Sequence, residues 1–236
     1  MTGRQPTVDD PNVLTGLLSE AKALILDFDG PICSVFSGFP APEVARQLRE
    51  ILAEGGHIEL PPEVGETRDP FDVLKHSATI GFDEARYIEA ALTAHEIEAV
   101  DTAQPTERAH ELIRVCADLE IPLGIASNNS RMAVEAYLAK WKLTEEVGSA
   151  IGRTQPDPAL LKPNPHLLRE AAAALGVAVN VCVFVGDYAT DIEAAEYAKM
   201  KVVGFANKDG KLKDFQEIHC PDAIVTNLGW LIDAIR

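Results

Sequence analysis

The stretch Leu24-Ile25-Leu26-Asp27-Phe28-Asp29-Gly30 decides how this chain folds. Its apolar start, from Ala23 to Leu26, predicts a buried strand, and two carboxylates follow that strand directly. Because side chains alternate along an extended chain, Asp27 and Asp29 should point the same way and converge on one site. The simpler alternative is that both are acids of a strand-ending turn. In open parallel sheets, ligands bind beyond the carboxyl ends of the strands, so we expect a site here.

Short apolar runs recur along the chain and alternate with amphipathic segments. This alternation is typical of an α/β fold, in which strands and helices wind into a parallel sheet. A helix opened by Pro11 is expected before the first strand. The further expected strands are Leu123–Ala126, Cys182–Val185, Val202–Phe205 and Ala223–Val225, and the helices between them are Thr106–Leu119, Arg131–Trp141, Pro165–Leu175, Thr190–Lys199 and Leu228–Ile235.

The segment 35–104 breaks this alternation. It contains helical patterns at Pro42–Ala53 and Asp83–Val100 but no convincing buried strand, and prolines interrupt it repeatedly. We therefore expect an inserted helical domain over 35–104, within a core formed by 1–34 and 105–236.

Composition narrows the class of partner. The formal net charge of -16 gives an average field that repels nucleic acid and anionic membranes, so we expect neither as a partner. No basic region with a long apolar run opens the chain, and no segment reaches the roughly 18 apolar residues of a membrane span. A cytoplasmic protein is the expectation. A phosphorylated ligand would have to be attracted locally, by a metal, a lysine and backbone N–H groups.

A second acidic turn, Gly186-Asp187-Tyr188-Ala189-Thr190-Asp191, follows the strand that ends at Val185. Asp187 and Asp191 are four residues apart at a helix start and can share one face, where their repulsion would need a cation or hydrogen-bond donors. Either carboxylate could instead be an ordinary N-cap. Oxygen-only ligands favour Mg²⁺ over Zn²⁺.

Two other polar positions follow predicted elements. Ser127, in Ile125-Ala126-Ser127-Asn128-Asn129, precedes a helix whose free N–H groups can hold an anion, although a capping role is an equally simple reading. Lys162, in Leu160-Leu161-Lys162-Pro163, lies in rigid chain before another helix. It could serve a site or be a solvated surface lysine.

In this order, D-x-D-G at Asp27, S-N at Ser127, K-P-x-P at Lys162 and G-D-x-x-x-D at Asp187 resemble the four signature motifs of the haloacid dehalogenase superfamily. The resemblance covers about Ala21 to Lys199. It implies a Rossmann-like parallel sheet with helices on both faces, and a small α-helical cap inserted after the first motif. Pro31 departs from the usual Thr or Val, which puts in doubt a hydrogen bond that a Thr side chain would make there.

The resemblance also implies roles. Asp27 would be the nucleophile and a metal ligand, Asp29 the general acid and base that offers its backbone carbonyl to the metal, and Lys162 the cation that neutralises Asp27 and the phosphoryl oxygens. Mg²⁺ would bind at Asp27, Asp29, Asp187 and Asp191. Ser127 would hold phosphate, and Asn128 would line the pocket.

Arg68 is the candidate for substrate recognition in the insert. It lies in a polar turn bounded by Pro70, before a helix, where a charged side chain can reach a ligand. Pairing with Glu66 or Asp69 on the surface is the alternative.

With these motifs, the resemblance implies a magnesium-dependent phosphatase that hydrolyses a small-molecule phosphate monoester through an aspartyl phosphate, and we expect a monomer or homodimer. A phosphomutase would keep every motif and differ in how the cap excludes water. A haloacid dehalogenase needs neither Asp29 nor Asp187, which argues against it. A non-catalytic binding or regulatory relative would not need the intact acids.

Overall fold

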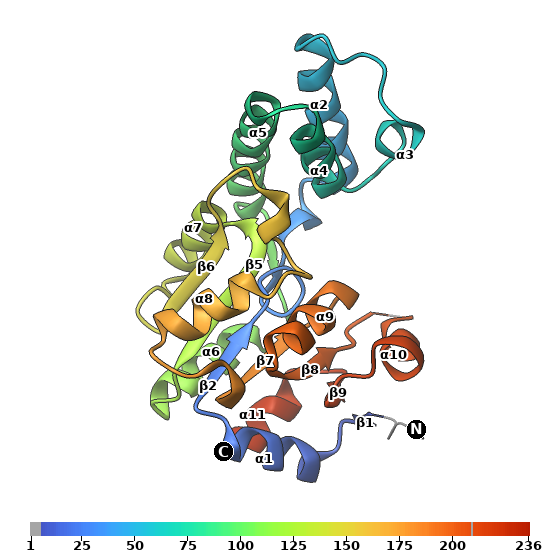
Figure 1. Ribbon diagram of the computed structural model, residues 1–236. Coiled ribbons are helices and arrows are strands. Elements are labelled where there is room, and N and C mark those ends of the chain that lie inside the picture. The colour runs from blue at the N-terminus through green and yellow to red at the C-terminus, as the bar shows by residue number, and fades with distance from the viewer. Residues whose placement is uncertain (1–5, 209) are drawn as a thin grey trace.

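The computed structural model describes residues 6–208 and 210–236, and these contain one parallel sheet of seven strands in the order β1-β9-β8-β7-β2-β5-β6 (Figure 1). The expected α/β class is confirmed. β2 lies near the middle of the sheet, between β7 and β5. The strands are β1 (Thr7–Val8), β2 (Ala23–Leu26), β5 (Leu123–Ser130), β6 (Ser149–Arg153), β7 (Cys182–Gly186), β8 (Lys201–Phe205) and β9 (Ala223–Val225).

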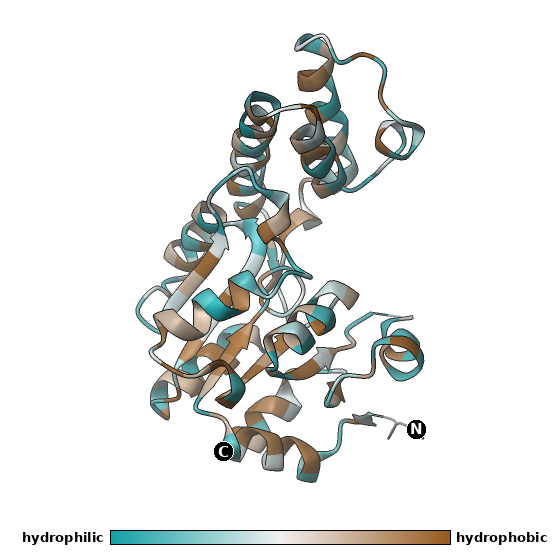
Figure 2. Cartoon of the chain, in the orientation of Figure 1, coloured by the Kyte–Doolittle hydropathy of each residue, from teal (hydrophilic) through white to brown (hydrophobic). Residues whose placement is uncertain are grey.

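Alternation along β2 divides the core between the two faces of the sheet. Leu24 and Leu26 pack in one apolar cluster with residues of α1, α6, α7 and α11, whereas Ala23 and Ile25 pack in a second with α8 and α9. Figure 2 shows hydrophobic residues concentrated along the strands. The helices of the core are α1 (Pro11–Glu20), α6 (Ala109–Asp118), α7 (Arg131–Trp141), α8 (His166–Ala174), α9 (Ala189–Ala198), α10 (Lys211–Asp214) and α11 (Gly229–Ile235).

The segment between the short antiparallel strands β3 (Cys33–Ser34) and β4 (Gln104–Pro105) is helical. It lies beyond the carboxyl ends of the central strands (Figure 1). An apolar cluster of its own holds it together, and Leu161 of the loop before Lys162 belongs to that cluster. Its helices are α2 (Ala41–Glu54), α3 (Pro62–Gly65), α4 (Pro70–Ile80) and α5 (Phe82–Val100).

Several short elements were not predicted, among them β6, β1 and α4. β6 has the sequence Ser-Ala-Ile-Gly-Arg, in which only Ile151 is β-branched, so its composition gives little strand signal. β1 is two residues long and pairs only with β9. α4 begins where Asp69 accepts the Phe71 N–H at 2.9 Å, a cap that falls within the proline-rich stretch.

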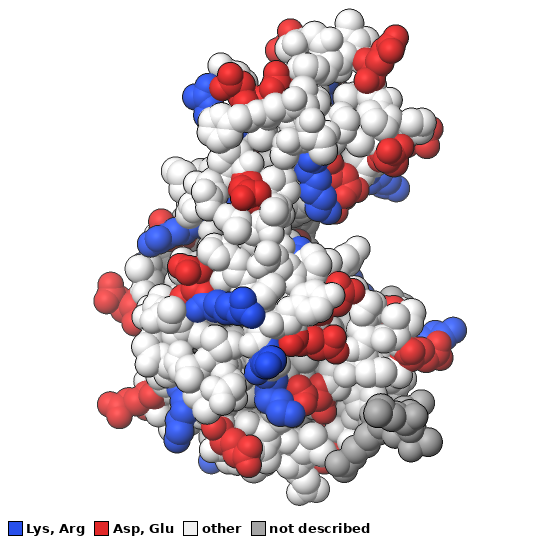
Figure 3. Space-filling model, viewed as in Figure 1, with Lys and Arg blue, Asp and Glu red and all other residues white. Residues whose placement is uncertain are grey.

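Charge is spread over the surface. On the face drawn in Figure 3, acidic and basic side chains are interspersed. No helix within the described ranges is both long enough and apolar enough to span a bilayer.

Candidate active site

Neighbouring parallel strands bring the two acidic turns together. Leu26 of β2 pairs with Val185 of β7, and the Asp27 N–H donates to the Val185 carbonyl at 2.9 Å. Asp27 therefore lies beside the turn that carries Asp187. Asp27, Asp187 and Asp191 are all buried, and each offers a carboxylate oxygen within 4.8 Å of those of the other two.

Two glycines allow this close approach. Gly30 has φ +112°, and a Cβ at that position would overlap the carboxylate of Asp187. A Cβ on Gly186 would likewise collide with the side chain of Asp191. Glycine is needed at both positions because another side chain would displace an acid of the cluster.

Lys162 is the cation of the cluster. Its Nζ lies 2.8 Å from Asp27 Oδ1 and 2.6 Å from Asp191 Oδ1, and the side chain is almost fully buried. Burial opposes the charged form, but the two carboxylates outweigh it and raise the pKa of Lys162. Lys162 is therefore a buried, charged residue of the site, and the surface reading is wrong.

The surroundings of Asp27 and Asp187 disfavour the charged form of both carboxyl groups. Burial, with repulsion from Asp191, raises the pKa of Asp27 above its usual range. Burial raises the pKa of Asp187 to about 6, although Lys211 contacts this carboxylate and opposes the shift. Lys211 was not singled out from the sequence, because it follows the motifs in a short helix with no distinguishing pattern. A divalent cation would relieve this repulsion, and the all-oxygen donor set fits Mg²⁺.

Asp191 serves the turn as well as the cluster. Its Oδ2 accepts the backbone N–H groups of Asp187 and Tyr188, each at 3.0 Å, while its Oδ1 accepts Lys162. Tyr188 is the N-cap of α9, and Asp191, three residues later, accepts its backbone N–H, so neither Asp187 nor Asp191 is itself the N-cap. With both oxygens in use, Asp191 can hold Asp187 and Lys162 in position and still lie at the edge of a metal site.

Asp29 differs from the clustered acids. It is exposed, and its Oδ1 accepts the Val35 N–H at 2.9 Å. Surrounding protein atoms desolvate the carboxyl group and raise its pKa, against the lowering effect of the Val35 hydrogen bond. An exposed carboxyl group that readily takes up a proton suits a residue that exchanges protons with substrate and water.

The end of β5, residues 127–130, follows an irregularity in its pairing with β6 after Ala126 and forms a bent segment, the Ser127 loop. It reaches the same edge of the sheet because β5 pairs with β2. Ser127 is buried, and its hydroxyl both accepts the Asn129 N–H and donates to Asn129 Oδ1, each at 3.2 Å. Asn128 Oδ1 accepts the Lys162 N–H at 2.8 Å. The side chain of Asn128 thus fixes the backbone that carries Lys162, a contact the sequence did not suggest.

Arg68 stands apart from these groups. It is exposed, and its side chain makes no hydrogen bond or ion pair with the residues that the structure describes. Asp69, one of its two alternative partners, caps α4 instead. Among the described residues, no hydrogen bond or ion pair links Arg68 to the carboxylate cluster, so its role in recognition stays a prediction.

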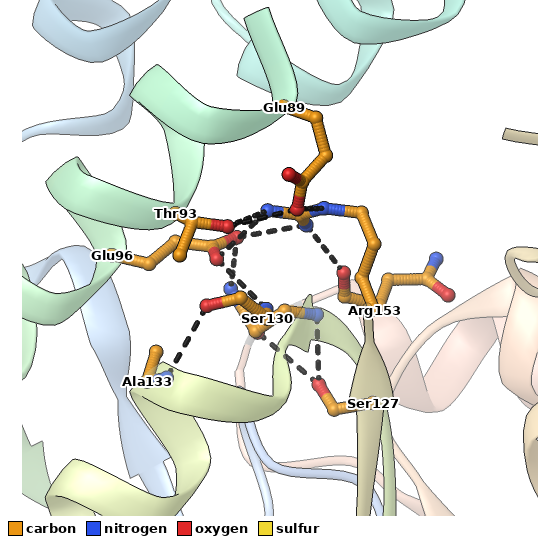
Figure 4. A network of polar contacts seen from close by, with 9 residues as sticks. Glu89, Thr93, Glu96, Ser127, Ser130, Ala133 and Arg153 are labelled. Atoms are coloured by element: carbon orange, nitrogen blue, oxygen red, sulfur yellow. Dashed lines mark hydrogen bonds and ion pairs between the residues drawn. The ribbon is translucent and has the colours of Figure 1, made fainter. Parts of the chain in front are cut away.

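A buried ion pair behind the Ser127 loop was also missed. Glu96 of α5 pairs with Arg153 at the end of β6, with 3.0 Å between Oε2 and Nη2, and Figure 4 shows the polar contacts around them. Both residues look like surface charges in sequence, because one lies in an amphipathic helix and the other ends an unrecognised strand. The two residues are 57 positions apart in the chain, and only the folded structure shows that they meet.

Comparison with known proteins agrees with this arrangement. YhcW of Bacillus subtilis (strain 168), whose name includes the word phosphatase, is 29% identical over 196 residues, which are 79% of this chain and 84% of that protein. Phosphoglycolate phosphatase of Neisseria meningitidis (strain Z2491) is 25% identical over 91% of this chain and 94% of its own length. A hydrolase structure from Pseudomonas syringae superposes with a TM-score of 0.63 at 18% identity, covering 89% of this chain and 95% of that one. The haloacid dehalogenase-like hydrolase family matches residues 21–199, and the chain belongs to this family.

Proposed function

We propose that this hydrolase is a magnesium-dependent phosphatase acting on a small-molecule phosphate monoester, with Asp27 as the nucleophile. The observation that carries the proposal is the position of Lys162, whose Nζ bridges Asp27 and Asp191 at 2.8 and 2.6 Å within a buried carboxylate cluster. A nucleophilic carboxylate must approach an anionic phosphate, and a fixed cation at the nucleophile offsets that repulsion.

Asp27, Asp187 and Asp191 would hold the magnesium ion, with the Asp29 backbone carbonyl as a further ligand implied by the family. The bound ion would neutralise charge on the phosphoryl oxygens. The raised pKa values of Asp27 and Asp187 support a cation here, because burial, the larger cause, and repulsion between the acids both disfavour the charged carboxylates, and a bound cation would favour them.

The chain's own residues account for two chemical steps. A carboxylate oxygen of Asp27 attacks phosphorus, the bond from phosphorus to the ester oxygen breaks, and Asp29 gives its proton to the departing alkoxide. Asp29 then takes a proton from a water molecule, whose oxygen attacks the aspartyl phosphate and releases inorganic phosphate and the Asp27 carboxylate. Lys162 and Ser127 hold the phosphoryl oxygens throughout.

The substrate class rests on the relatives and on the helical segment. Two similar proteins carry phosphatase names, one of them for phosphoglycolate, a small phosphate monoester. We propose that 35–104 acts as a cap that closes over the site, excludes water and contacts the leaving group, since the motif residues would contact only phosphate and metal.

Phosphate release from p-nitrophenyl phosphate tests the proposal. Purified protein should release phosphate with Mg²⁺, stop in excess chelator and recover when Mg²⁺ is restored. Ca²⁺ should inhibit, because its larger radius and looser coordination misplace the nucleophile. Turnover that persists in excess chelator, or no turnover of any phosphate monoester in a broad panel, would refute the assignment.

A further inference from the structure

Glu96 is a fully buried carboxylate inside the helical segment. It accepts four hydrogen bonds: Asn129 Nδ2 at 3.1 Å and Arg153 Nη1 at 3.1 Å reach Oε1, while the Ser130 N–H at 2.8 Å and Arg153 Nη2 at 3.0 Å reach Oε2 (Figure 4). A buried charge survives only when its hydrogen bonds are satisfied, and this one is paired and bonded on both oxygens.

Arg153 connects the same group to a larger part of the molecule. Its Nη1 donates to the Asn128 carbonyl at 2.7 Å, and its Nε donates to Glu89 Oε1 at 3.2 Å. Glu89 lies about two helical turns before Glu96 on α5. Its guanidinium group also lies 5.7 Å from the ring centre of Phe71 on α4. Arginine suits this place because its planar fork offers five N–H donors in a fixed geometry, whereas a lysine ammonium group offers three.

Two of the four hydrogen bonds to Glu96 come from the loop that carries Ser127, and Arg153, which donates the other two, also binds that loop. Asn129 donates to Glu96 through Nδ2 and accepts the Ser127 hydroxyl through Oδ1, so one side chain joins the carboxylate to the serine. The Ser130 N–H and the Asn128 carbonyl are held by Glu96 and Arg153 respectively. Glu96 and Arg153 therefore hold a backbone or side-chain group of each of the three residues after Ser127.

We propose that Glu96 and Arg153 are positioning residues that hold the Ser127 loop in the conformation that binds phosphate. The helical segment then contributes to the phosphate site through α5, in addition to any role in covering it. This inference rests on the proposed function, because it takes Ser127 as a phosphate contact. Within the described ranges, neither side chain forms a hydrogen bond or ion pair with the carboxylate cluster, so the pair acts on the site through the loop.

A purely structural role for Glu96 and Arg153 would have different consequences from a positioning role. If the pair only fastened the helical segment to the core, its loss would lower the melting temperature and leave phosphate affinity and magnesium activation unchanged. A positioning role predicts weaker phosphate binding with little change in the Mg²⁺ concentration for half-maximal activity, because Asp27 and Asp187 lie on the loops after β2 and β7.

The test compares Glu96→Gln with Glu135→Gln. Glu135 belongs to an exposed ion pair with Arg131 on α7, at 2.7 Å, in the helix that follows the same loop. The inhibition constant of inorganic phosphate against p-nitrophenyl phosphate should rise about 10- to 100-fold in Glu96→Gln, as expected when a contact group is misplaced. It should stay at the wild-type value in Glu135→Gln.

Asn129→Ala provides a second variant should Glu96→Gln fail to fold. It removes the link between Glu96 and Ser127 and keeps the ion pair, so it should weaken phosphate binding with a smaller loss of melting temperature. Folded Glu96→Gln or Asn129→Ala protein with wild-type phosphate inhibition would overturn the inference.

Amide hydrogen exchange separates this inference from the proposed function. The Ser130 N–H donates to Glu96, so its exchange should be faster in Glu96→Gln than in wild type and Glu135→Gln. Unchanged exchange across residues 127–130 would reject the positioning role. A wild-type protein that neither hydrolyses phosphate monoesters nor binds inorganic phosphate would instead reject the proposed function, and the phosphate role of the pair with it.

Discussion

The Nζ of Lys162 lies 2.8 Å from Oδ1 of Asp27, although 135 residues separate them in the chain, and the same Nζ lies 2.6 Å from Asp191 Oδ1. One buried cation is thus shared between the proposed nucleophile and an acid that also organises the turn of Asp187. Loss of the cation should affect both the charge on Asp27 and the position of Asp191.

Lys162→Met should lower kcat by about 10²- to 10³-fold, because a fixed positive charge is lost where negative charge develops. It should also lower the melting temperature, since two buried carboxylates lose their partner. Lys201→Met, which breaks the exposed pair with Asp222 at 2.6 Å, is the control and should change neither quantity much. Near-normal kcat in folded Lys162→Met would contradict the proposed role.

The two acids of the first motif should fail in different ways. Asp27→Asn should reduce turnover by about 10³-fold or more, with no phosphorylated protein, because the attacking oxygen is lost. Asp29→Asn should still release about one equivalent of p-nitrophenol in a burst, because this leaving group needs little protonation, and then stop at the aspartyl phosphate. Rapid-quench measurement of nitrophenol and of phosphorylated protein distinguishes the two. Normal steady-state phosphate release by either variant would rule out the mechanism.

Much of this site could be predicted because its acids follow buried strands. The apolar runs before Asp27 and Asp187 mark the ends of β2 and β7, and parallel strands bring their carboxyl ends to one edge. The order of the motifs then predicted that Lys162 belongs to the same site, and the structure places it beside Asp27. The features of the site that could not be predicted are contacts between side chains that are far apart in the sequence.

Glu96 and Arg153 illustrate that limit. A glutamate in an amphipathic helix is normally solvated, and nothing local shows that this one is buried against β6. Lys211 contacts Asp187 from a helix of four residues, too short to give a periodic signal. Asn128 was expected in the pocket, but which of its atoms hold Lys162 is decided by loop geometry alone.

Metal binding should weaken as the pH falls. In the metal-free protein the pKa of Asp187 is raised to about 6, so below that pH a proton must leave before a cation binds. Because the folded pKa exceeds the unfolded one, the metal-free protein loses stability as the pH rises through about 6, and Mg²⁺ restores it. The rise in melting temperature caused by Mg²⁺ should be larger at pH 8 than at pH 5. An equal rise at both would contradict the assignment of Asp187.

Arg68→Ala should alter substrate preference without altering the chemistry. We expect kcat/KM to fall for at least one phosphorylated metabolite of a panel, with little change for p-nitrophenyl phosphate, because the motif residues are untouched. Arg86→Ala is the control, since Arg86 is also exposed in the helical segment and pairs with Asp83. Equal effects on all substrates, or none, would remove Arg68 from the specificity site.

Gly30 offers a way to test the cluster without changing a charge. Alanine at this position would meet two penalties: a backbone at φ +112°, which costs on the order of 1–3 kcal/mol, and overlap with the Asp187 carboxylate. Gly56→Ala is the matched control, because Gly56 has φ +93° and nothing lies within 4 Å of a Cβ built there.

Both variants should therefore lose stability, but only Gly30→Ala should displace Asp187. We expect Gly30→Ala to require a higher Mg²⁺ concentration for half-maximal activity and to gain less melting temperature from Mg²⁺ than wild type. Gly56→Ala should respond to Mg²⁺ as wild type does, at a lower overall melting temperature. The comparison separates backbone strain from the geometry of the site. A Gly30→Ala protein with the wild-type magnesium response would show that the metal does not depend on Asp187 as placed here.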